Sequence, residues 1–120
     1  MKALTIREPY VSPIALGLKH YETRSWGTAY RGPILIHTAK AVLPDPVEGM
    51  EHLFPLGCIV LRADITDCIR MDEAFIASLD ETEKSLGFYS EGRYAWKLEN
   101  VREVEPAKAS GKLGLWEVES

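Results

Sequence analysis

A long alternating segment, residues 57–69, is the feature that most constrains the fold of this 120-residue chain. Apolar side chains occupy every second position, which predicts a strand with one buried face and one partly wet face. Other strand-like runs occur along the chain, and Pro106 is expected to end the one before the last. These runs cover residues 3–6, 19–26, 33–38, 92–104 and 113–118.

Helical signals are short, and the strand-like runs are grouped rather than alternating with helices. This order predicts an α+β fold with a mixed or barrel-like sheet of about six strands, flanked by two or three short helices. The first helix is expected to begin at Glu8-Pro9 or at Ser12-Pro13, and a second helix is expected to cover residues 47–53. A third helix is expected over residues 73–79, after a capping Asp72. The acidic tract 80–83 is expected to form either an exposed turn or a further helix.

Length and composition predict a single domain spanning residues 1–120, with 46% hydrophobic and 27% charged residues. We find no apolar run of about 18 residues, and charge appears directly after the N-terminus, so we expect neither a membrane partner nor a signal peptide. A cytoplasmic location follows as an expectation. The sequence leaves the oligomeric state open, with a monomer favoured.

The cysteines and histidines give no metal signature. Cys58 and Cys68 are expected to be buried free thiols, because they lie too far apart along one strand to pair. The histidines are scattered without ligand spacing, so we expect no metal site and no cofactor.

Charge is distributed unevenly along the chain. The total is −4, yet residues 1–40 hold six cationic side chains and two carboxylates, a net of +4, and residues 41–120 hold a net of −8. Such asymmetry hints at an anionic partner for one face.

The densest polar segment, residues 17–26, carries polar side chains on both faces of a strand, which suits a strand that lines a wet cleft. A pair formed by Glu22 with Arg24 or Lys19 could fix the edge of a base or balance a proton during hydrolysis. The alternative is that these are surface ions on an edge strand.

Aromatic residues near the positive charge could stack unpaired bases. Trp26, in a polar neighbourhood, is the better candidate. Of Tyr94 and Trp96, one is expected in the core and one in a cleft.

Three segments of the chain form a pattern: Glu8-Pro9-Tyr10-x-Ser12, Gly17-x-Lys19-x-x-Glu22-x-Arg24-Ser25-Trp26 and Tyr30-Arg31-Gly32-Pro33-x-Leu35-Ile36-His37. This pattern closely resembles the ASCH domain, which is named for activating signal cointegrator homology and belongs to the PUA-like superfamily. Later segments agree with the resemblance: Pro55–Ile59, Asp64-x-x-Asp67-Cys68, Tyr94-x-Trp96 and the strand at 111–118.

The resemblance implies a PUA-like barrel, a cleft lined by Lys19, Glu22 and Arg24, and binding of nucleic acid, mainly RNA. One similar bacterial branch hydrolyses acetylated cytidine with a lysine, a threonine and a glutamate. Lys19 matches that lysine, whereas Glu22 stands at the threonine position. The glutamate would fall within residues 72–83. Relatives commonly have Gln-Pro-Trp where this chain has Glu8-Pro9-Tyr10, so Glu8 is expected to bring negative charge near the cleft.

The sequence therefore predicts a protein that binds RNA or DNA, or a nucleoside-like small molecule. The alternatives are a small hydrolase of acylated cytidine or another modified nucleoside, with Lys19 and Glu22 as catalytic groups, or a ribonuclease. The expected ligand-binding residues are Tyr10, Ser12, Lys19, Glu22, Arg24, Ser25, Trp26, Tyr30 and Arg31.

Overall fold

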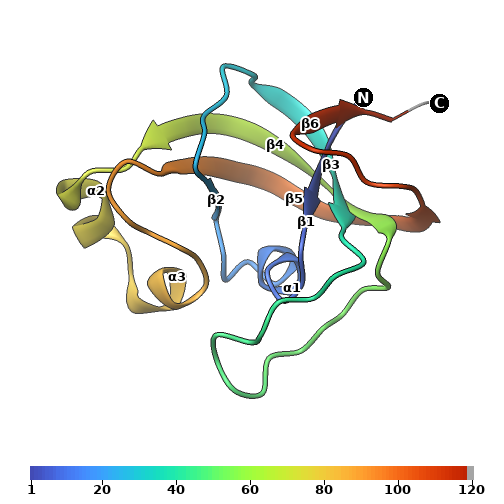
Figure 1. Ribbon diagram of the computed structural model, residues 1–120, viewed down its shortest axis with the longest axis horizontal. Helices are drawn as coiled ribbons and strands as arrows, with labels where there is room; N and C mark the ends of the chain where they lie inside the picture. The colour runs from blue at the N-terminus through green and yellow to red at the C-terminus, as the bar shows by residue number, and fades with distance from the viewer. Residues whose placement is uncertain (119–120) are drawn as a thin grey trace.

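The computed structural model describes residues 1–118, which form one curled six-stranded sheet with three short helices (Figure 1). The strand order is β2-β5-β4-β3-β1-β6; β1 runs parallel to β3, and the other neighbours are antiparallel. The elements are β1 (Lys2–Ile6), α1 (Val11–Ala15), β2 (Tyr21–Arg24), β3 (Gly32–Thr38), β4 (Cys58–Arg70), α2 (Glu73–Ser78), α3 (Glu81–Ser85), β5 (Tyr94–Lys108) and β6 (Leu115–Glu117).

The two long strands, β4 and β5, arch across the whole molecule and carry the curl of the sheet (Figure 1). Their register shifts at three places, and such bulges bend and twist a strand pair. The result is a half-barrel, which confirms the expected α+β barrel-like architecture. At its start β4 is buried on both faces, from Cys58 to Leu61, so the predicted wet face begins only at Arg62.

Pro106 does not end its strand, as the sequence analysis had expected, because β5 continues to Lys108. The proline lies opposite the register shift between Ile59 and Leu61 of β4. A proline has no N–H to donate and is tolerated at such a bulge.

The helix expected over residues 47–53 is absent from the described structure, where this part of the long β3–β4 connection is irregular. Gly49 has a φ of +81°, outside the helical region. Val47 and Leu53 are more than 40% exposed, so a helix here would bury too little apolar surface to be stable.

The first helix begins at Val11, which is later than Glu8-Pro9, and Ser12 does not cap it. Instead the carboxylate of Glu8 accepts hydrogen bonds from the backbone N–H groups of Val11 (2.9 Å) and Ser12 (2.8 Å). Glu8 is fully buried in this role. Its carboxylate is therefore engaged at the start of α1, and Glu8 is not among the residues that line the cavity described below.

The helices α2 and α3 both begin at an acidic cap, of which Asp72 was predicted and Asp80 was not. Asp72 accepts from the N–H of Phe75, and Asp80 accepts from the N–H of Glu83. The tract after Asp80 thus forms the further helix, one of the two alternatives.

The core lies between α1 and the inner strands. Its largest members are Leu4, Ile14, Ile34, Ile36, Leu61, Ile65 and Trp96. Both cysteines are free thiols, with Cys58 buried and Cys68 only half-buried. Of the helices in residues 1–118, none has the length and apolar character needed to span a bilayer.

Candidate ligand-binding cavity

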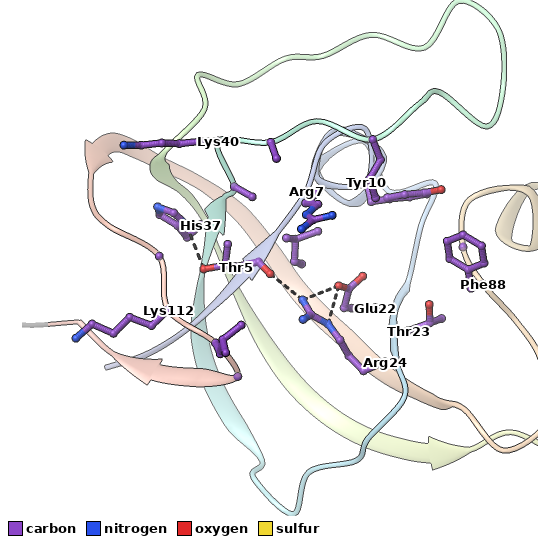
Figure 2. Close-up of a pocket in the computed structure, with 18 of the residues that line it drawn as sticks. Thr5, Arg7, Tyr10, Glu22, Thr23, Arg24, His37, Lys40, Phe88 and Lys112 are labelled. Carbon is purple, nitrogen blue, oxygen red and sulfur yellow. Dashed lines mark hydrogen bonds and ion pairs between the residues drawn. The ribbon is translucent and has the colours of Figure 1, made fainter.

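A cavity of about 750 Å³ opens where β1, β2 and β3 meet three connecting segments (Figure 2). This volume is in the usual range for small-molecule sites. The connecting segments are the start of the β3–β4 loop at 39–43, the chain after α3 at 87–88, and the segment 110–114 that leads into β6.

The lining is strongly cationic, although the whole chain is acidic. Among residues 1–118 it contains five basic side chains and one carboxylate, Glu22. Glu22 is already paired, since its Oε2 accepts from Arg24 Nε (3.0 Å) and lies 2.9 Å from Nη2. Arg24 Nη2 also donates to the carbonyl of Thr5 (2.7 Å), which ties β2 to β1. The other four cations, Arg7, Lys19, Lys40 and Lys112, form no ion pair with any carboxylate in the described part of the chain.

Lys19 is the most enclosed of these cations, with 2% of its surface exposed. Its Nζ lies 5.5 Å from the ring centre of Tyr10 and 5.6 Å from that of Tyr89, distances at which aromatic faces attract a cation. Burial lowers the pKa of Lys19, against the opposing effect of Glu22 and Glu83. Its ammonium group forms no ion pair with a carboxylate among residues 1–118, and Lys19 lines the cavity, where a ligand can meet it.

Glu83 is the glutamate within 72–83 that approaches this site. It is 3% exposed, which corrects the expectation that the acidic tract is solvated. Its Oε1 accepts from the backbone N–H of His20 (2.8 Å), and its Oε2 accepts from the hydroxyl of Tyr89 (2.6 Å). Burial and this bond raise the pKa of the Tyr89 phenol. Glu83 thus holds the chain after α3 against the segment that carries Lys19.

The structure brings four of the nine expected ligand-binding residues together in the cavity wall: Tyr10, Lys19, Glu22 and Arg24. The other five lie outside the lining. Ser12 is fully buried and donates to the Glu8 carboxylate, and Ser25 is exposed to solvent. Trp26 packs edge-to-face on Trp96, and the Tyr30 hydroxyl donates to the carbonyl of Pro33. The Arg31 guanidinium lies 3.8 Å from the Asp67 carboxylate.

The aromatic expectations were partly wrong. Trp96 is completely buried in the core, and Tyr94 packs against the same core rather than in the cavity. Phe88, which the sequence analysis did not select, is 65% exposed at the cavity. Its exposure depends on the path that the chain takes after α3, and no sequence pattern predicted that path.

Other lining residues were also missed, among them Thr5, Arg7, His37, Lys40 and Lys112. Arg7 and Lys40 belong to the basic first third of the chain, and that excess charge was the available signal. Thr5 and His37 lie on strands that the sequence predicts to be buried, and only the pairing of β1 with β3 brings the two residues together. The described residues contain no group of three or more side chains able to hold a metal ion.

A curled sheet flanked by short helices, with a cationic cavity edged by aromatic side chains, defines a small α+β fold. The match to a family model specifies it further: residues 4–108 match the ASCH domain, and the chain belongs to that family.

Two curated relatives are similar to this chain. Activating signal cointegrator 1 from Homo sapiens is 24% identical over 135 aligned residues, covering 98% of this chain and 22% of the relative. Activating signal cointegrator 1 from Mus musculus is 27% identical over 103 residues, covering 71% of this chain and 18% of the relative. The chain thus spans about a fifth of the length of these relatives.

Proposed function

We propose that this protein binds nucleic acid, RNA in the first place, in the cavity around Lys19, Glu22 and Arg24. The observation that carries the proposal is the charge of the wall, where four cations lack a carboxylate partner within residues 1–118 of an acidic chain. Such unneutralised cations attract phosphates, which position a strand without reading its sequence. Membership of the ASCH family supports the same ligand class.

Aromatic side chains beside the cations support a nucleic acid over a simple anion. Phe88 is largely exposed and Tyr10 is half-buried, and both line the cavity (Figure 2). Every base has a face that can stack on such a ring. In the same cavity wall, the Lys19 ammonium group can donate and Glu22 Oε1 is an acceptor that Arg24 leaves unused, so a base edge would meet both kinds of partner.

Fluorescence anisotropy with a labelled single-stranded RNA, at several salt concentrations, tests the proposal. The double variant Lys40→Gln/Lys112→Gln removes two exposed lining cations and should reduce the slope of log K against log salt by about 1.4. Phe88→Ala should weaken binding about fivefold or more.

The matched control is Arg102→Gln/Lys108→Gln, which removes two exposed cations of β5 outside the cavity. It should leave the salt slope unchanged. A parallel titration with DNA of the same sequence decides between the two nucleic acids. Absence of binding to either strand at low salt, or equal effects of the two double variants, would overturn the proposal.

A second candidate is hydrolysis of an acylated nucleoside in the same cavity. The observation that favours it is Lys19, whose burial lowers its pKa and makes the neutral amine available as a base near the Glu22 carboxylate. A panel of acylated nucleosides, assayed with wild type and Lys19→Ala, tests it. Equal turnover by both proteins, or none, would exclude this role for Lys19.

A further inference from the structure

A threonine and a histidine that the functions above leave unused are hydrogen-bonded to each other in the cavity wall. Thr5 on β1 and His37 on β3 are direct partners in the parallel ladder. Thr5 Oγ1 lies 3.2 Å from His37 Nδ1, and Figure 2 shows the contact on the side of the cavity nearest Lys40 and Lys112.

The partners of the imidazole decide which way this bond runs. His37 Nε2 lies 2.6 Å from the carbonyl oxygen of Ala109, and a carbonyl can only accept. In the neutral ring Nε2 therefore carries the hydrogen, and Nδ1 presents its lone pair to Thr5. The Thr5 hydroxyl must then donate to Nδ1, as a nucleophile donates to its general base.

A second donor fixes the threonine oxygen itself. Trp116 Nε1 lies 3.0 Å from Thr5 Oγ1, and an indole N–H can only donate. The oxygen thus gives its hydrogen to His37 and accepts one from Trp116. A donor at this position would also stabilise negative charge that develops on Oγ1 as the proton leaves.

A glycine packs directly against this pair. A Cβ on Gly111 would lie 2.8 Å from Thr5 Oγ1 and 3.1 Å from His37 Nδ1, so any larger residue would press on both atoms. Gly111, Thr5 and His37 all line the cavity. A small ligand would therefore reach Thr5 Oγ1 from the cavity and not from the side that Gly111 covers.

We propose that Thr5 Oγ1 is an acyl-accepting nucleophile, with His37 as its general base, and that the cavity hydrolyses small acyl esters or amides carried by an anionic molecule. This goes beyond nucleic-acid binding and supplies a nucleophile for the hydrolase candidate, which has Glu22 at the expected threonine position. The cations of the wall match the anionic carrier.

The reaction has two halves. Thr5 Oγ1 bonds to the acyl carbon as its proton moves to His37 Nδ1; the bond from that carbon to the leaving group then breaks, and His37 returns the proton to the leaving group. Water next attacks the Thr5 ester with His37 again taking a proton. This releases the carboxylic acid and restores the threonine hydroxyl.

The test uses p-nitrophenyl acetate, whose leaving group is coloured, with mass spectrometry of the acid-quenched protein. Wild type should release p-nitrophenolate and carry an acetyl group on the Thr5 peptide. Thr5→Val should lose both signals, and Thr5→Ser should retain them. His37→Gln removes the base but keeps a side-chain N–H for Ala109, and it should slow acylation about 100-fold.

A purely structural role is the competing explanation, because the same bonds fasten residues 109–116 to the sheet. His37→Gln separates the two roles, since it keeps a donor for the Ala109 carbonyl and removes the imidazole base. It should slow acetylation of Thr5 while thermal unfolding stays cooperative. Acetyl groups on lysines alone, or equal rates in wild type and Thr5→Val, would overturn the proposal. RNA binding is measured separately, so either proposal can fail without the other.

Discussion

Lys19 and Gly87 approach so closely that a Cβ on Gly87 would lie 2.9 Å from Lys19 Nζ. The same Cβ would lie 2.9 Å from Tyr89 Cε2. Gly87 follows α3 and lines the cavity beside Phe88. A residue without a side chain is therefore what lets the ammonium group of Lys19 sit between its two aromatic neighbours and face the cavity.

Gly87→Ala should displace Lys19 and weaken RNA binding about as much as Lys19→Met does. The two changes act on one group, so they should not add: Gly87→Ala/Lys19→Met should bind as Lys19→Met alone. Anisotropy titrations of the four proteins complete the cycle. Additive losses would show that Gly87 acts on the ligand without Lys19.

Glu8→Ala should lower the free energy of unfolding by about 2–3 kcal/mol, measured by urea denaturation. The carboxylate is fully buried and satisfies the N–H groups of Val11 and Ser12 and the Ser12 hydroxyl, all of which would lose their partner. Glu8→Gln keeps one acceptor oxygen and should lose less. An unchanged unfolding midpoint in Glu8→Ala would contradict the role of Glu8 at the start of α1.

Glu83→Ala should cost about 2–3 kcal/mol of unfolding free energy, because it leaves the His20 N–H and the Tyr89 hydroxyl without their acceptor. Glu81→Ala is the matched control: the Glu81 side chain is 95% exposed on the same helix and should change stability by less than about 0.5 kcal/mol. Equal effects of the two variants would contradict the buried role of Glu83.

How far the sequence predicts the structure depends on the range of the interaction involved. Strand alternation and helix caps act over a few residues, and both β4 and the cap Asp72 were predicted correctly. Register is a long-range property. The bulge that accommodates Pro106 depends on pairing with β4, which is far away in the sequence, so the predicted end of β5 was wrong.

The site shows the same limit. The cluster of Lys19, Glu22 and Arg24 lies within six residues, yet spacing alone left surface ions as an alternative, and only the resemblance to the ASCH domain predicted a shared cleft; all three line the cavity. The Thr5–His37 contact spans 32 residues, and the bond from His37 to Ala109 spans 72. No local pattern marks such a pair, because each residue reads as an ordinary strand position until the sheet is assembled.

The lowered pKa of Lys19 makes both stability and binding depend on pH below the ordinary lysine value of 10.5. Between the folded pKa and 10.5, the unfolded chain holds a proton on Lys19 that the folded protein lacks. Stability therefore rises with pH across this window, since the state that binds more protons is the unfolded one. Lys19→Met removes this dependence. The unfolding free energy of wild type minus that of Lys19→Met should therefore increase as the pH rises.

RNA affinity should change in the opposite direction, because only the ammonium form of Lys19 attracts a phosphate. Wild-type affinity should fall as the pH rises through the folded pKa, and that of Lys19→Met should be flat. The pKa values of the phenols beside Lys19, Tyr10 and Tyr89, are both raised, so these groups lose their protons at higher pH than ordinary phenols do. Stability and affinity that change in the same direction would show that the titrating group is not the Lys19 amine.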